Sequence, residues 1–194
     1  MGAIEISSIL TRGSVQMYTQ ARSNYSTAES IARMQGSLRF WTDILDDDAR
    51  LAGLWGKTNS TAGLFGQAGV TVTCGGNDVT GWVMDTAAPI AALQTAAALP
   101  VACPGTDPRD NSDVLLVRHA AAEQNVTARN GVVQIQSNGS VGMFFDNGIA
   151  PDTAKEGGVI FDVAFNAYYV SNQSRYDANL PSLRRLSLVN NRIV

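Results

Sequence analysis

The sequence contains one histidine, His119, and any serine hydrolase chemistry would have to use it as the base. Ser112 and Asp113 lie close to it in sequence, so a Ser–His–acid site is the first chemistry to consider. Nothing in their spacing places these residues as nucleophile, orienting acid and base. A histidine at the end of a strand is the expectation instead, and we predict no enzyme.

Oxygen-rich side chains occur together at Asp107, Asp110, Asn111 and Asp113, which are ligand types that calcium prefers. They lack the spacing of the twelve-residue calcium loop, and an ordinary acidic loop is expected. Asp46–Asp48 are consecutive acids on a predicted helix, where neighbours point about 100° apart, so a solvated helix edge is expected. One histidine and two cysteines cannot supply a zinc site, and we predict no metal and no cofactor.

The two cysteines, Cys74 and Cys103, both lie among turn residues, and two cysteines can form one bridge without leaving a free thiol. We predict a disulfide between them, which would place the protein in an oxidising compartment. The alternative is two unpaired thiols in a reducing cytosol.

The composition argues against two classes of partner. The formal net charge is −3, the sequence pI is about 5.0 and only 16% of residues are charged, so there is no basic surface for nucleic acid. No run of 18 apolar residues occurs, and the sequence predicts no membrane-spanning segment within these 194 residues.

The first 56 residues predict a long helix. Apolar side chains recur at steps of three and four, which marks one helical face, at Ile31, Met34, Leu38, Trp41 and Leu45. A weaker pattern that includes Ile9 and Met17 precedes it, and Gly13 predicts a break or fraying of the helix there. The helix should end near Gly53 or Gly56. We expect its first half to project from the domain and to pack on something outside this chain.

The remainder predicts a sheet. Residues 57–112 are rich in loop residues, with a strand expected at Val79–Met84 and a short helix at Ala87–Leu99. Residues 113–194 alternate in the manner of strands, and Asn138-Gly139 predicts a hairpin turn. The expected fold class is α+β, with the 1–56 helix packed on an antiparallel sheet and residues 1–194 forming one domain.

Several segments together resemble PilW-type minor pilins of the bacterial type IV pilus. The matching pieces lie, in order, at Ala32–Phe40, Ile44–Leu45, Asp48–Gly56, Cys74, Trp82, Cys103, Ser112–Arg118, Ala167–Val170 and Pro181–Arg185. The family begins with an apolar helical segment that is missing here, so the chain is expected to be part of a longer protein. Glu5 does not match the family's glutamate, because no apolar run surrounds it.

The resemblance implies a pilin-like domain that helps to start pilus assembly and to form the tip complex. Its partners would be other minor pilins, the major pilin and a large tip adhesin, with the inner membrane reached through the missing segment. The protein would occupy the inner membrane and periplasm, then the extracellular pilus. Of the seven helix-packing residues, Ile9 and Met17 should face partners, while Met34, Leu38, Trp41 and Leu45 should face the protein's own sheet.

Two alternatives stay open. The first is a minor pseudopilin of a type II secretion system, whose helix and sheet would be similar. The second is an adhesive or ligand-binding module, in which the 57–112 region binds a sugar or a host receptor with Trp82 as a stacking surface.

Overall fold

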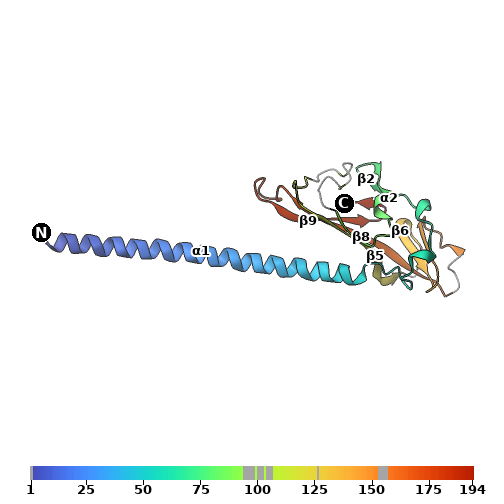
Figure 1. The fold of residues 1–194 in the computed structure, drawn as a ribbon, viewed down its shortest axis with the longest axis horizontal. Helices are drawn as coiled ribbons and strands as arrows, with labels where there is room; N and C mark the ends of the chain where they lie inside the picture. Colours follow the sequence, from blue (N-terminus) through green and yellow to red (C-terminus); the bar gives the residue numbers. More distant parts are fainter. Residues whose placement is uncertain (1, 94–98, 100–102, 104–106, 126, 153–156) are drawn as a thin grey trace. The chain divides into compact units, whose positions relative to one another are not determined.

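The computed structural model describes residues 2–93, 99, 103, 107–125, 127–152 and 157–194, with side chains from residue 12 onward except that of Asn125 (Figure 1). The chain divides into two compact units, residues 1–47 and residues 48–194. Each unit is described by itself below. The last turn of the long helix belongs to the second unit.

The helix α1 covers Gly2–Leu51, as the spacing of its apolar residues predicted. It continues through Gly13 without the expected break. No proline occurs in this range, and Glu29 pairs with Arg33 one turn later at 2.5 Å. Gly53 then adopts a left-handed φ of 77°, and this ends the helix where the sequence predicted. Among the described residues, no helix is long and apolar enough to cross a membrane.

In the described residues between the helix and residue 113, the elements are short. They are η1 (Thr61–Gly63), β1 (Leu64–Phe65), η2 (Gln67–Gly69), β2 (Thr73–Cys74), β3 (Asn77–Asp78), α2 (Thr80–Val83) and β4 (Ile90–Leu93).

Two expectations for this segment were wrong. A strand was expected at Val79–Met84, but most of it is the helical turn α2, whose first amide, Thr80 N, donates to Asp78 Oδ1 at 2.8 Å. A helix was expected at Ala87–Leu99, but β4 pairs there with a longer strand, and this tertiary pairing overrides the helix propensity of alanine. The rest of that expected helix includes residues 94–98, which lie outside the described residues.

Six further strands complete the sheet. They are β5 (Val114–Asn125), β6 (Asn130–Ser137), β7 (Gly142–Asn147), β8 (Val159–Ser171), β9 (Ser182–Val189) and β10 (Arg192–Ile193). The β6–β7 hairpin forms around Asn138-Gly139 as predicted, and Asn138 Oδ1 accepts from the amides of Ser140 and Val141.

Strand β8 is the centre of the sheet (Figure 1). One of its edges pairs with β5, while the other pairs first with β6 and then with β9, all antiparallel. Two edge pairs are parallel, β1 with β7 and β10 with β2. The α+β class with one long N-terminal helix is therefore confirmed, but the sheet is mixed and not antiparallel throughout as expected. The two exceptions arise because two-residue strands of the loop-rich segment return beside the sheet.

The chain between helix and sheet is fixed by backbone contacts. Gly53 N donates to Arg118 O at 3.0 Å and Ala120 N donates to Leu54 O at 2.7 Å, so this segment extends the edge of β5 beyond β4. Trp55 is buried and packs edge-on against Phe144 at 5.3 Å between ring centroids. These contacts place the helix end at one position on the sheet.

The disulfide between Cys74 and Cys103 is present, as the sequence predicted, with 5.0 Å between the Cα atoms. Both residues are buried in the hydrophobic core of the second unit. The bridge closes a loop with a sequence separation of 29 residues. In the chain-entropy description, closing a loop of this length stabilises the fold by about 3.5 kcal/mol.

Gly56 provides a test of how closely the helix–sheet connection packs. Its φ is 72°, and a Cβ there would lie 2.4 Å from Ser137 Oγ and 2.5 Å from the Phe161 ring. We expect Gly56→Ala to lower the free energy of unfolding by at least about 2 kcal/mol, measured by urea denaturation. Gly81→Ala is the matched control, because nothing lies within 4 Å of the position that a methyl group would take there, in α2. An equal loss in both variants would contradict the close approach at Gly56.

Candidate functional site

The residues considered for hydrolase chemistry are not brought together. His119 lies inside β5 and is buried, whereas the sequence placed it at the end of a strand. The Ser112 hydroxyl donates to the carbonyl of Arg109 at 2.7 Å. Its hydrogen bond thus serves a local turn, and the structure shows no contact between Ser112 and His119.

The loop considered for calcium is held by amide side chains. Asp107 Oδ1 accepts from Asn172 Nδ2 at 3.1 Å, and Asp107 Oδ2 accepts from Gln173 Nε2 at 3.2 Å. These contacts tie the loop to the end of β8. In the described part of the chain, no group of three or more His, Cys, Asp or Glu side chains is placed to hold a metal ion.

The polar side chains that do come together surround Asp48, in the last turn of α1. Asp48 Oδ2 accepts hydrogen bonds from Asn166 Nδ2, at 2.6 Å, and from the Tyr168 hydroxyl. Asp48 Oδ1 lies 3.5 Å from His119 Nε2. We call Asp48, His119, Asn166 and Tyr168 the Asp48 cluster. The expectation that Asp46–Asp48 form a solvated edge was therefore wrong for Asp48.

The cluster is built from the end of one helix and the middle of two strands. His119 faces Ala164 across the β5–β8 pair, and Asn166 and Tyr168 follow on β8 at intervals of two residues. Side chains at such intervals share one face of a sheet. The cluster therefore forms when β5 and β8 keep their register and Asp48 reaches the face that these strands share.

Electrostatics in the cluster favour an ionised Asp48 and a neutral Tyr168. Burial alone would raise the pKa of Asp48, but the nearby His119 imidazole and the hydrogen bonds from Tyr168 and Asn166 outweigh it and lower that pKa below its ordinary value of 3.8. Burial and the hydrogen bond to Asp48 raise the pKa of Tyr168 to about 12. Tyr168 therefore acts as a permanent donor to the carboxylate at neutral pH.

Both ring nitrogens of His119 face acceptors. Nδ1 lies 2.8 Å from the carbonyl oxygen of Ala120, and Nε2 faces the Asp48 carboxylate. A neutral imidazole can donate to only one of them, while an imidazolium can donate to both. His119 therefore lies between an acceptor on its own strand and the carboxylate at the helix end.

The neighbouring residue, Arg118, holds a different segment on the opposite face of β5. Its guanidinium donates to the carbonyls of Trp82 and Ala88, each at 2.6 Å, and its Nε donates to the carbonyl of Val83 at 3.1 Å. Its charge also lies 5.4 Å from the centre of the Phe165 ring. Desolvation lowers the pKa of Arg118, and the nearby charge of Asp85 opposes that shift. Arg118 thus fastens α2 to the sheet.

The helix-packing residues are distributed as follows. Met17 is 78% exposed, and Met34 and Leu38 are each 60% exposed. That the last two face the protein's own sheet stays a prediction. Ile31 is also exposed, whereas Trp41 and Leu45 are half-buried. Ile9 lies in α1, but its side chain is outside the described residues. Their contact with partner helices stays a prediction.

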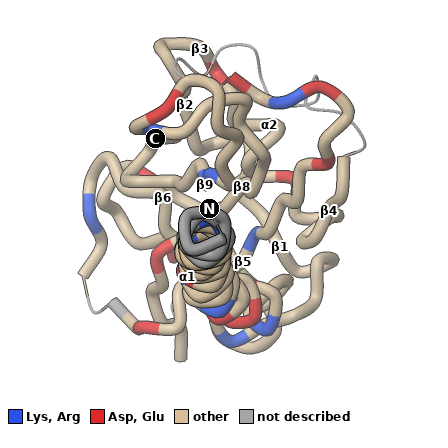
Figure 2. The backbone as a smooth tube through the Cα atoms, turned by 90° about the vertical axis from the view of Figure 1, so that its left-hand side faces the viewer, with Lys and Arg blue, Asp and Glu red and all other residues tan. Residues whose placement is uncertain are grey.

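Trp82, considered as a stacking surface for a ligand, packs within the protein. Its ring meets that of Phe165 at 4.6 Å between centroids, with an interplanar angle of 64°, and it is partly buried. The charged residues of the second unit are scattered along its backbone (Figure 2). Within the described residues, we therefore take the Asp48 cluster as the candidate functional site. Its geometry positions the end of a helix.

Asp48 should contribute strongly to stability. Asp48→Ala would leave the buried donors of Asn166 and Tyr168 without their acceptor and would remove the carboxylate that His119 faces. We expect a loss of about 3 kcal/mol in the free energy of unfolding. Asp47→Ala is the matched control, because Asp47 is exposed and its change should stay within about 0.5 kcal/mol. Equal urea midpoints for the two variants would show that the cluster does not hold the helix end.

The contribution of Asp48 should also depend on pH. Because its pKa is lower in the folded protein than the ordinary 3.8, the stabilisation is complete above pH 3.8 and is lost as pH falls through the folded-state value. The difference in unfolding free energy between the wild type and Asp48→Ala should therefore be constant from pH 7 to about 5 and shrink below pH 3.8. Urea titrations at several pH values measure it, and a difference unchanged at about pH 2 would contradict the charged hydrogen-bonded form.

Comparison of the chain with protein-family models, with curated proteins and with known solved structures finds no match to any of them. The structural description above is therefore the basis for the functional proposal.

Proposed function

We propose that this protein is a minor pilin of a type IV pilus, a structural subunit that takes part in starting the filament and in forming its tip. The observation that carries the proposal is the 47-residue N-terminal unit, a single helix whose apolar side chains Met17, Ile31, Met34 and Leu38 are exposed. An isolated helix gains most of its stability from packing an apolar face, so this unit calls for an external partner.

The spacing of the apolar residues favours other helices as that partner. Ile31, Met34, Leu38, Trp41 and Leu45 follow one another at steps of three, four, three and four residues, the spacing of a coiled-coil seam. The positions beside this seam are uncharged and mostly small, at Ala28, Ser30, Gln35, Ser37, Thr42 and Ile44. Uncharged flanks allow neighbouring helices to approach on both sides, as in a bundle of several helices.

The second unit supports the same proposal. It is a disulfide-closed sheet domain, and such bridges persist in oxidising compartments such as the periplasm and the cell exterior. Residues from the segments that resemble minor pilins have structural roles in this domain. Gly53 ends the helix, Trp55 fills the core, and Gly56 allows the close approach to Phe161. Arg118, the last residue of another such segment, fastens α2.

A crosslinking experiment in a piliated bacterium tests the proposal. The full-length gene would carry a photoreactive amino acid at Leu38, in the seam, or at Arg39, an exposed neighbour off the seam, as the matched control. We expect covalent adducts with other pilin subunits from position 38 and far fewer from position 39, identified by mass spectrometry. Adducts with secretion-system pseudopilins would favour the pseudopilin alternative. The absence of pilin adducts from position 38 in piliated cells would overturn the proposal.

A further inference from the structure

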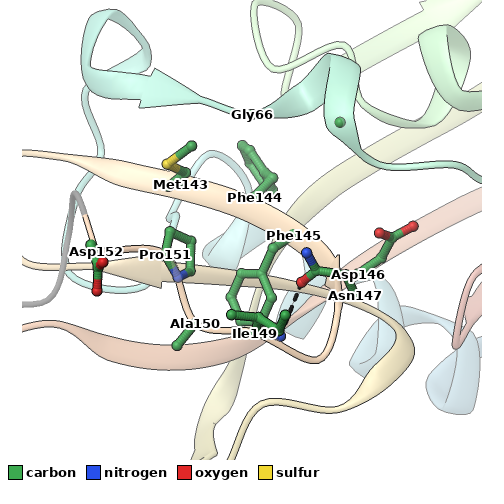
Figure 3. A pocket seen from close by; sticks show the side chains of 11 residues that line it. Gly66, Met143, Phe144, Phe145, Asp146, Asn147, Ile149, Ala150, Pro151 and Asp152 are labelled. Carbon is green, nitrogen blue, oxygen red and sulfur yellow. Dashed lines mark hydrogen bonds between the residues drawn. The ribbon is translucent and has the colours of Figure 1, made fainter.

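A surface pocket of about 390 Å³ lies in the second unit, between β7, the residues after it and the η2 turn (Figure 3). Two of its polar side chains already bond within the protein. Asp146 Oδ2 accepts from Thr71 N at 3.0 Å, and Asn147 Oδ1 accepts from Ile149 N at 3.0 Å. These bonds shape the pocket itself. The first unit, by contrast, carries a short polar side chain that makes no such bond.

That side chain is Asn24, which interrupts a row of apolar residues on α1. Met17, Asn24, Ile31 and Leu38 follow one another at intervals of seven residues, and all four side chains are exposed. A seven-residue interval keeps side chains on one side of a helix that winds gently around a partner. Asn24 therefore belongs to the seam of the proposed helix contact, between Met17 and Ile31.

Charged side chains of this part of the helix lie away from the seam. Glu29 comes five residues after Asn24 and Arg33 comes two residues after Ile31, so they point roughly 140° and 160° away from those residues. Glu29 and Arg33 also pair with each other at 2.5 Å. The amide of Asn24 is thus on the uncharged side of the helix, with an apolar residue one heptad before it and one heptad after it.

The next seam positions on either side of Asn24 are also polar, but they demand less of a partner. The Thr27 hydroxyl donates to the carbonyl of Ser23 at 2.9 Å, within the helix. Gln20 has a longer side chain, which can carry its amide out of a seam to water. Asn24 makes no side-chain hydrogen bond among the residues that the structure describes. It therefore brings to a helix contact a short amide whose donor and acceptor are both unused.

Burying such an amide between two helices is unfavourable unless the hydrogen bonds that it loses to water are replaced. A facing Asn or Gln replaces them, since each amide both donates and accepts. We propose that Asn24 sets the register of the helix contact by pairing with an amide side chain in the seam of a neighbouring helix, which belongs to a different pilus subunit. This inference rests on the proposed function and specifies a property of the partner.

The register would be poorly defined without Asn24. A shift of the partner helix by one heptad, about 10 Å along the axis, would still place apolar layers opposite Met17, Ile31 and Leu38, because these residues repeat at the same interval. The same shift would place Asn24 against an apolar layer. Asn24 therefore discriminates between registers, and between subunits with and without an amide at this level. Such selectivity suits a subunit with one place in a tip complex.

The test is photocrosslinking in a piliated bacterium, with the full-length gene and a photoreactive amino acid at Ala28. Ala28 lies beside the seam, one helical turn from Asn24, so the probe leaves the amide in place. Mass spectrometry identifies the subunit and the residue that are joined. The probe is then combined with Asn24→Leu, with Asn24→Gln, which keeps an amide, and with Ser26→Leu, which adds an apolar side chain off the seam.

With Asn24 present, we expect adducts at one site of one partner subunit, within a helical turn of an Asn or Gln in its helix. Asn24→Leu should lower the ratio of this adduct to adducts on other subunits or one heptad away by about tenfold. The two control variants should keep the ratio within about threefold of the unmodified value. Leucine favours a helix more than asparagine does, so unfolding of α1 would not explain the change.

An unchanged ratio in Asn24→Leu, or an equal fall in either control variant, would overturn the inference. A partner helix with only apolar side chains at the crosslinked level would overturn it as well. So would adducts from Leu38 without any from Ala28, because the helix contact would then end before Asn24. The proposed function survives each of these results, and it fails only if Leu38 itself gives no pilin adducts.

Discussion

A carboxylate in the last turn of a helix faces the partial negative charge of the helix end, so its position there needs donors from elsewhere. Asp48 receives them from Asn166 and Tyr168 on β8 and faces His119 on β5. Each of these side chains would be costly to bury without the others. The contacts among these four side chains therefore determine together where the helix ends, which face of the sheet its end reaches and how β5 and β8 are aligned.

The contacts of the Asp48 cluster also constrain the backbone that comes after Asp48. Once Asp48 is held on the sheet, the chain reaches Gly53 within little more than one helical turn, and the Gly53 amide bonds to the carbonyl of Arg118. The left-handed turn at Gly53 redirects the chain along β5, and Trp55 enters the core soon after the helix ends at Leu51. The transition from helix to sheet is thus completed within a few residues.

Much of this arrangement could be predicted from the sequence. The periodicity of Ile31–Leu45 indicated the helix, Gly53 its end, Asn138-Gly139 the hairpin, and the turn residues around Cys74 and Cys103 the bridge. These signals are local, because each reflects the conformational preferences of residues that are close together in sequence.

The errors concern features that depend on distant partners. The segment at Val79–Met84 has the composition of a strand, but the bonds of Arg118 to its carbonyls hold a helical turn, and no local pattern indicates that contact. The parallel edge pairs of β1 and β2 join residues far apart in sequence. The Asp48 cluster was missed for the same reason, although a lone histidine beside an arginine in an apolar strand was a sign that both would be buried and need partners.

Arg118 and His119 are consecutive, and because side chains alternate along a strand they serve opposite faces of β5. A shift of the strand by one residue would turn an imidazole toward the three carbonyls of Trp82, Val83 and Ala88, for which it has too few donors. It would also withdraw the histidine from Asp48. Alternative pairings of β5 are therefore penalised on both faces together, so this dipeptide selects a single alignment of the sheet during folding.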